Sequence, residues 1–386
     1  MLLDGPDSIG VHEFLSDYWQ KKPLLIRGAL PGFTDPVSPE ELAGLACEED
    51  VESRIVYSTN DTWSMKPGPF TERDFTFLPE HDWTLLVQSV DHWLPDVKAL
   101  LETVPFIPAW RLDDVMISYA AKNGGVGPHF DYYDVFLVQG MGSRRWRTGA
   151  VCDSRTPVQT GSGLRILDSF VTAQEWVLES GDVLYVPAGL SHWGTAETAG
   201  LCYSIGFRAP DAGELLAAIS HHAGEPAGSD RRYRDPLLAA EARPGEIDNR
   251  ALRQATAMLQ AAIADEAMLL SSFGTLMTEP RLPELLEPPD RTMSPVDLAQ
   301  ALQKGMLLER HPASRLACHH DGADLHLFVN GEHLYIPDTP ALLDALNDEL
   351  QSALARPLDL KRFQRNEACL NLLSSLYNQG CLVRTA

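Results

Sequence analysis

The sequence has little cysteine, and its cysteines do not come in pairs. Six cysteines are scattered over 386 residues without a CxxC pair, which excludes structural zinc sites built from several thiolates. No apolar run approaches the roughly 18 residues that a membrane-spanning helix needs. The first residues also lack the basic stretch and apolar core of a secretory signal peptide. These absences favour a reducing compartment with free thiols, so we expect a cytoplasmic protein.

Positive charge is also scarce. The chain has 31 Lys and Arg against 54 Asp and Glu, which gives a formal net charge of −23. A field of this sign repels phosphate backbones and attracts basic molecules. We therefore do not expect direct nucleic-acid binding, whereas a basic protein would be a suitable partner.

Tryptophan is absent from the second half of the chain, since all eight tryptophans lie between Trp19 and Trp193. This shift in composition predicts a domain boundary soon after residue 200. Before that boundary, a capping box at Ser38–Glu41 predicts the start of a helix. From about residue 112, short β-rich runs separated by Gly and Pro are typical of a β-sandwich or a jelly-roll barrel. The clearest runs are 135–138, 144–148, 176–178 and 183–186, and Gly140–Gly142 predicts a hairpin turn between the first two.

The second half is predicted to be mostly helical. An apolar stripe at helical spacing fits either a helix that faces a core or a subunit interface; it consists of Leu252, Ala255, Leu259, Ala262 and Ile263. Further on, Ser294–Asp297 caps a helix that Gly305 ends. Asn330 and Gly331 predict a type I′ hairpin, and two more helices follow, from near Pro340 and from near Arg362. Helices combined with a terminal hairpin resemble a winged helix.

One group of residues has the pattern of a metal site. His129 and Asp131 are two residues apart, so on a strand both side chains would point to the same face. His192 follows 61 residues after Asp131, behind the predicted strand 183–186 and a turn with Pro187 and Gly189. Two imidazoles and one carboxylate form the facial triad of non-haem Fe(II) oxygenases, which leaves metal positions open. An HxD pair alone is most often structural, but the second histidine in a β context favours a metal site.

An oxygenase that uses a 2-oxo acid also needs a cation for the far carboxylate of that cosubstrate. Arg144, Arg145 and Arg147 lie on the next predicted strand, and guanidinium binds carboxylates through two parallel hydrogen bonds. Strand alternation puts Arg144 on one face and the other two arginines on the opposite face. The periodicity does not decide which face points inward.

These segments resemble the JmjC-type cupin ribosomal oxygenases, most closely the bacterial ribosomal-protein arginine hydroxylases of the YcfD type. The similarity runs through PHFDYYDVFLVQGMGSRRWRTG at 128–149, GDVLYVPAGLSHWG at 181–194 and YSIGFRAP at 203–210. It implies an α+β fold in three parts. Residues 1–210 would form a double-stranded β-helix (cupin, jelly-roll) barrel, residues 211–288 a helical dimerisation region that makes a homodimer, and residues 289–386 a winged-helix-like domain.

The resemblance further implies an Fe(II)- and 2-oxoglutarate-dependent dioxygenase that consumes O2 and hydroxylates the β-carbon of an arginine. The expected substrate is the large-subunit ribosomal protein L-sixteen (uL16). By position, the iron ligands are His129, Asp131 and His192, and the residues that bind 2-oxoglutarate are Arg144 and Ser118. The substrate arginine pocket is lined by Asp114, Met116, Tyr133 and Ser204.

The sequence leaves two alternatives open. Another 2-oxoglutarate oxygenase, such as a histidyl hydroxylase or a lysine demethylase, would use the same site residues. A dimeric metal-binding cupin without catalytic activity would bind metal tightly and turn over no 2-oxoglutarate. A second histidine-rich stretch, His319, His320, His326 and His333 with Asp324, is interpreted as an exposed hairpin with polar faces, because a metal site there would need a folded-back geometry.

Overall fold

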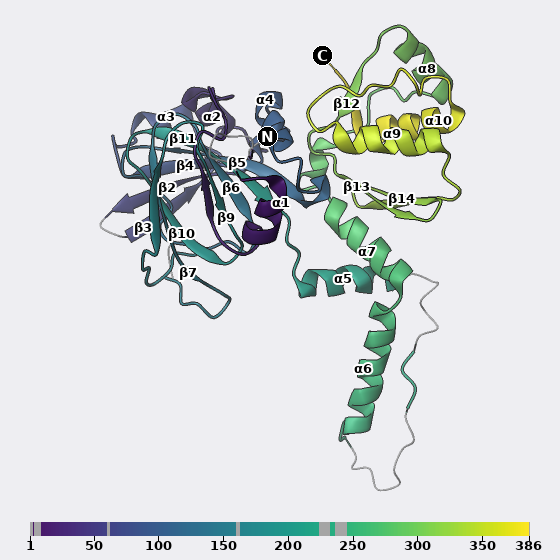
Figure 1. Cartoon of the computed structure of the whole chain (residues 1–386), viewed down its shortest axis with the longest axis horizontal. Coiled ribbons are helices and arrows are strands. Elements are labelled where there is room, and N and C mark those ends of the chain that lie inside the picture. The colour runs from purple at the N-terminus through teal and green to yellow at the C-terminus, as the bar shows by residue number, and fades with distance from the viewer. Residues whose placement is uncertain are drawn as a thin grey trace. The chain divides into compact units, whose positions relative to one another are not determined.

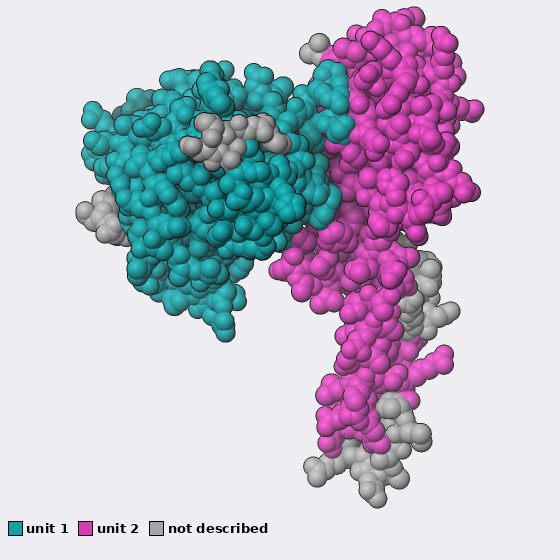
Figure 2. All heavy atoms as spheres, viewed as in Figure 1, with its two compact units in different colours: residues 1–209, 352–357 teal, residues 210–351, 358–386 magenta. Residues whose placement is uncertain are grey.

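The computed structural model describes residues 3, 9–59, 62–159, 163–223, 232–235 and 245–385. The chain divides into two compact units, residues 1–209 with 352–357 and residues 210–351 with 358–386 (Figure 2). Among the residues that the structure describes, no helix is both long and apolar enough to cross a membrane. The finer division at residues 210 and 288 stays a prediction.

The first unit is built from two antiparallel sheets (Figure 1). The larger sheet has the strand order β1-β9-β6-β11-β5-β4-β2-β3, and the smaller has the order β10-β7-β8. The strands of the larger sheet are β1 Leu24–Ile26, β2 Ser53–Thr59, β3 Thr62–Pro67, β4 Trp83–Val87, β5 Leu112–Ala120, β6 Val135–Gln139, β9 Val183–Val186 and β11 Gly200–Phe207. Those of the smaller sheet are β7 Arg144–Val151, β8 Gln174–Leu178 and β10 Leu190–Ala196. This arrangement confirms the predicted double-stranded β-helix.

The hairpin predicted at Gly140–Gly142 is wrong. Strand β6 pairs with β9 and β11 in the larger sheet, whereas β7 pairs with β8 and β10 in the smaller one. The glycine turn therefore carries the chain from one sheet to the other. Gly142 has φ +76°, and a Cβ there would lie 2.3 Å from the carbonyl oxygen of Ala199, so this crossing requires glycine for space as well as for conformation.

Short helices pack against the larger sheet. They are α1 Val11–Glu13, the π-turn η1 Phe14–Tyr18, α2 Pro39–Leu45, α3 Glu72–Thr76, η2 Val90–His92, α4 Pro95–Lys98, η3 Ala99–Thr103 and η4 Ala109–Arg111. The capping box predicted at Ser38–Glu41 is confirmed, since the Ser38 side chain accepts from the Glu41 N–H and the Glu41 carboxylate accepts from the Ser38 N–H. Between helices and sheet lies an aromatic core in which Phe14, Phe136, Tyr185 and Phe207 pack ring against ring.

The second unit contains the helices α5 Ala212–Ala223, α6 Asn249–Ile263, α7 Glu266–Thr278, η6 Pro283–Leu285, α8 Pro295–Gln303, α9 Ala341–Ser352 and α10 Glu367–Asn378. Strands β12 Leu308–Arg310 and β16 Leu382–Arg384 pair with each other, and β13 Leu316–Asp321, β14 Asp324–Val329 and β15 Glu332–Ile336 form a meander. The predicted turn is confirmed, because Asn330 and Gly331 both have positive φ between β14 and β15. The last helix starts at Glu367 behind an Asn366 cap, later than predicted.

Helix α6 does not face a core formed by the described residues. None of its residues is buried, and Leu252 and Leu259 are 55% and 66% exposed. The core-facing interpretation of the apolar stripe is therefore wrong as far as the described residues are concerned. The subunit-interface interpretation stays a prediction.

Candidate metal centre and active site

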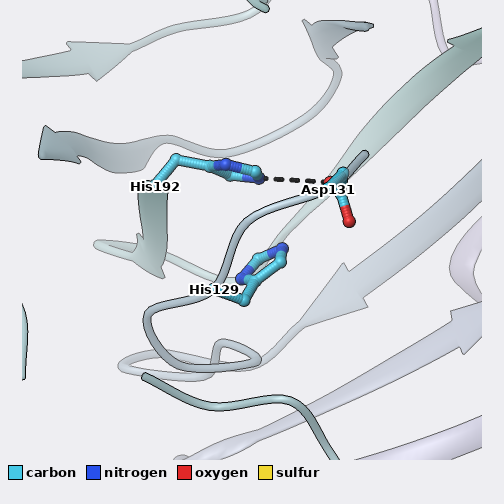
Figure 3. A group of neighbouring side chains, drawn as sticks. All are labelled: His129, Asp131 and His192. Carbon is cyan, nitrogen blue, oxygen red and sulfur yellow. Dashed lines mark ion pairs between the residues drawn. The ribbon is translucent and has the colours of Figure 1, made fainter. Parts of the chain in front are cut away.

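Three side chains of the predicted motif converge in the first unit. His129, Asp131 and His192 each offer one ligand atom, and these atoms lie within 4.8 Å of one another, the only such group of three found among the described residues. His192 Nε2 lies 3.6 Å from a carboxylate oxygen of Asp131 (Figure 3). Two nitrogens and one oxygen at this spacing are the donor set of a non-haem iron site.

A few backbone hydrogen bonds between a loop and one strand fix the positions of the three ligands. His192 lies on β10, while His129 and Asp131 lie in the segment between β5 and β6. An isolated bridge joins the two histidines, with each N–H donating to the other's carbonyl oxygen at 3.0 and 2.8 Å. The carbonyl oxygen of Asp131 accepts from the Gly189 N–H at 2.7 Å. The turn that the sequence places before His192 therefore also holds the carboxylate ligand.

Both imidazoles are oriented as metal ligands usually are. Nδ1 of His129 lies 2.9 Å from the carbonyl oxygen of Gly127, and Nδ1 of His192 lies 3.0 Å from that of Leu190. Because a carbonyl oxygen can only accept, Nδ1 carries the proton and leaves the Nε2 lone pair for a metal. Burial and the neighbouring His129 lower the pKa of His192 to about 4, which keeps this ring neutral near pH 7. The residues present therefore fit a divalent iron ion.

Every other residue that the sequence predicts for the site lines the same cavity as the triad. These residues are Ser118 and Arg144 for the cosubstrate and Asp114, Met116, Tyr133 and Ser204 for the substrate. They come from β5, β7, β11 and the loop that carries His129 and Asp131. The double-stranded β-helix thus brings together residues that lie as much as 90 positions apart in the sequence.

The structure resolves which arginine points inward. Burial alternates along β7, and Arg144 is only 7% exposed. Its Nη1 donates to Ser118 Oγ at 2.9 Å, whereas its Nη2 has no hydrogen-bond partner among the described residues. Burial lowers the pKa of Arg144, yet a guanidinium stays charged at neutral pH. A buried guanidinium with an unsatisfied N–H in a cavity fits an anionic ligand such as a carboxylate.

The other two arginines face away from the cavity. Arg145 forms ion pairs with Glu175 and Glu197. The guanidinium of Arg147 lies 3.8 Å from the ring centre of Trp193. Neither is among the residues that line the cavity of the triad.

Asp114 is held by residues that the sequence did not single out. Its Oδ2 accepts from the Ser89 N–H at 2.9 Å, the Ser89 hydroxyl at 2.8 Å and Gln88 Nε2 at 2.8 Å. Ser89 adopts a left-handed backbone conformation with φ +52°, which is strained for a residue with a side chain. Three donors on one oxygen favour the ionised carboxylate. No motif marks Gln88 or Ser89, because their role depends on the pairing of β4 with β5.

Tyr133 completes this end of the cavity. The negative charges of Asp131 and Asp114, together with burial, raise the pKa of its phenol. The side chain is therefore a neutral aromatic ring beside a carboxylate. Such a pair is suited to a guanidinium, which stacks on the ring and forms an ion pair with the acid.

The chain matches the JmjC domain family over residues 99–215 and the ROXA-like winged helix family over residues 261–383. It is 34% identical over 371 residues to the ribosomal protein uL16 3-hydroxylase of Escherichia coli, a match that covers 95% of this chain and 96% of that protein. The chain belongs to the JmjC-type ribosomal oxygenases. It is also 43% identical to a probable ribosomal oxygenase of Haemophilus influenzae over 217 residues, which cover 56% of this chain and 54% of that protein.

Solved structures of the Escherichia coli ribosomal oxygenase YcfD share this fold over almost the whole chain. An X-ray structure superposes with a TM-score of 0.85 at 32% identity and covers 98% of both chains. A complex of YcfD with cobalt and 2-oxoglutarate superposes with a TM-score of 0.83 at the same identity, covering 98% of this chain and 99% of that one. JmjC-type ribosomal oxygenases use Fe(II), 2-oxoglutarate and O2, so the predicted enzyme class and cofactors are confirmed.

Proposed function

We propose that this ribosomal oxygenase hydroxylates the β-carbon of an arginine in a basic ribosomal protein, and that the protein is uL16, after which the Escherichia coli relative is named. The observation that carries the proposal is Asp114, a fixed carboxylate beside the ring of Tyr133 in the cavity of the triad. A neutral substrate side chain would form no ion pair with Asp114, and an acidic one would be repelled by it. A guanidinium would gain both an ion pair and a stacking partner.

The residues that would bind the iron and 2-oxoglutarate line the same cavity. His129, Asp131 and His192 would hold the iron through Nε2, a carboxylate oxygen and Nε2, leaving its remaining positions open. Arg144, steadied by Ser118, would bind the far carboxylate of 2-oxoglutarate. When bound, the iron and 2-oxoglutarate supply the oxidising chemistry that uses O2, yields succinate and CO2, and places one oxygen atom on carbon.

At the other end of the cavity, the protein would position the side chain of the substrate arginine. Met116 and Ser204 lie directly opposite each other on β5 and β11, and both line the cavity beside Asp114. A side chain held at its far end by Asp114 would lie along this surface toward the triad. Because Ser89 and Gln88 fix Asp114 in advance, a bound arginine would present one particular C–H bond to the iron, which is the main contribution a protein makes to such a reaction.

The test is turnover of a uL16 peptide. The purified enzyme is incubated with Fe(II), ascorbate, 2-oxoglutarate and an arginine-containing uL16 peptide, and the product is sequenced by mass spectrometry. We expect one added oxygen atom on an arginine. Asp114→Asn should lower kcat/KM for the peptide by roughly a hundredfold, because the charged partner of a buried ion pair is lost at a cost of about 3 kcal/mol.

Asp113→Asn is the matched control, since Asp113 pairs with Arg208 and does not line the cavity. It should leave kcat/KM for the peptide nearly unchanged. Oxygen found on a histidine, or demethylation of a lysine, would contradict the proposal in favour of the other oxygenase activities. Metal binding without any peptide-dependent succinate would favour a non-catalytic scaffold.

We also propose that the chain forms a homodimer through the helical region 211–288, with the barrel at 1–210 and the winged-helix domain at 289–386. The exposed leucines of α6 support this proposal. The net charge of −23 supports a basic protein partner and disfavours direct binding of nucleic acid.

A further inference from the structure

Three histidines lie on one face of the sheet formed by β13, β14 and β15. His319 of β13 is directly opposite His326 of β14, and His333 of β15 is directly opposite Phe328. His326 and Phe328 are two residues apart on one strand, so they share a face. The three strands therefore each contribute one imidazole to the same surface.

Two of these imidazoles already contact each other. His326 Nδ1 lies 2.9 Å from His333 Nε2, and the two ring centres are 5.1 Å apart. Nδ1 of His333 also lies 3.1 Å from the Ser271 hydroxyl of α7. A hydrogen bond at Nδ1 orients Nε2 toward His326, as the outer partners of metal-binding histidines do.

The third imidazole is nearby and exposed. The ring centre of His319 is 6.0 Å from that of His326. In their present rotamers the two rings are too far apart to bind the same ion. His319 is exposed whereas His326 and His333 are half-buried, since α7 packs on this sheet and its Gly274 contacts the Phe328 ring. An exposed side chain changes rotamer within nanoseconds, so His319 is free to swing toward the pair.

The charges around the cluster favour a cation. Asp321 and Asp324 are directly opposite each other at the end of the same face. Asp324 accepts from the Tyr335 hydroxyl at 2.6 Å and from the Asp338 N–H at 2.9 Å, which fixes its carboxylate in place. Two carboxylates therefore lie on the same face as three imidazoles, which are ligands of the kind that zinc, copper and nickel prefer.

We propose that His326 and His333 bind a zinc ion through Nδ1 and Nε2, with His319 as the third protein ligand. Zinc–nitrogen bonds of about 2.0–2.1 Å in tetrahedral geometry place two nitrogens roughly 3.3 Å apart, a few tenths of an ångström more than their present separation. The ion replaces the hydrogen bond between the two rings and joins three strands. This site is separate from the iron triad and does not rest on the proposed function.

The test is a zinc titration of the full chain without a histidine tag. His129→Ala and His192→Ala are introduced first, so that the triad does not compete, and the protein is stripped of metal. We expect one equivalent of zinc to bind in competition with a chromophoric chelator. His326→Ala and His333→Ala should weaken binding by at least a hundredfold, and Ser271→Ala by about tenfold.

His320→Ala is the matched control. His320 is the neighbour of His319 but faces the other side of the sheet, where its Nε2 lies 2.7 Å from Asp344. Zinc affinity should be unchanged in this variant. Absence of tight zinc binding, or binding that His326→Ala and His333→Ala leave intact, overturns the proposal, as does an equal loss in His320→Ala.

X-ray absorption of the zinc-loaded protein tests the ligands without further substitutions. Three imidazole nitrogens around the zinc would support the site, and an all-oxygen shell would overturn it. His326→Ala in the otherwise native chain should also leave succinate formation unchanged. The zinc site and the hydroxylase activity therefore fail or hold independently.

Discussion

Replacing Arg144 by methionine should separate the stability of the barrel from its affinity for 2-oxoglutarate. Without a ligand, Arg144 is a buried cation whose Nη2 has no hydrogen-bond partner among the described residues. Leaving such a group unsatisfied costs about 1–3 kcal/mol. Methionine replaces the aliphatic stem of arginine and carries no charge, so the ligand-free variant should be more stable than the native chain by about that amount.

The same change should nearly abolish 2-oxoglutarate binding. Removing one partner of a buried ion pair costs about 2–5 kcal/mol, which corresponds to a loss of roughly 30- to several-thousandfold in affinity. The favourable effect on stability and the loss of binding share one cause, because the site keeps a buried charge that only its anionic ligand satisfies.

The assay is unfolding of the metal-loaded protein under nitrogen, with and without 2-oxoglutarate. Tryptophan fluorescence is suitable because all eight tryptophans lie in the first unit. 2-Oxoglutarate should raise the unfolding free energy of the native chain. Arg144→Met should have a higher unfolding free energy than the native chain without the ligand, and 2-oxoglutarate should raise it by almost nothing. Arg145→Met, on the exposed face of the same strand, should respond to the ligand like the native chain. A destabilised Arg144→Met variant that 2-oxoglutarate still stabilises normally would contradict the role assigned to Arg144.

Three further predictions concern single residues. Ser118→Ala removes one hydrogen bond to Arg144 and should raise the KM for 2-oxoglutarate by roughly five- to tenfold, at a cost of about 1 kcal/mol, as measured by succinate formation. Burial lowers the pKa of His192 to about 4 from its ordinary 6.5, so the unfolded chain takes up a proton there first. As the pH falls from 6.5 to about 4, the unfolding free energy of the metal-free protein should therefore decrease by up to about 3 kcal/mol. His192→Gln should remove that part of the decrease. Leu259→Glu places a charge on the exposed stripe of α6 and should convert the proposed dimer to monomers in light scattering; an unchanged mass would exclude this stripe as the interface.

Short motifs predicted more of the site than of the topology. His129, Asp131 and His192 were visible in the sequence because metal ligation needs particular residue types, and the turn before His192 is marked by Pro187 and Gly189. Strand alternation likewise separated Arg144 from its neighbours, although only the observed burial shows that Arg144 is the one inside.

What the sequence could not provide was the choice of strand partners. The turn at Gly140–Gly142 has the composition of a hairpin, but it crosses between sheets, since pairing is decided by strands far along the chain. For the same reason, Gln88 and Ser89 could not be associated with Asp114 before the pairing of β4 with β5 was known.

The activity that we propose for this chain is oxidation of an arginine of uL16. Its most direct test is mass spectrometry of uL16 isolated from cells that carry the intact gene and from cells that carry a His129→Ala, His192→Ala allele. We predict one uL16 arginine with an additional oxygen atom in the first cells and the unmodified arginine in the second. Identical uL16 arginine peptides from both would contradict the proposed activity.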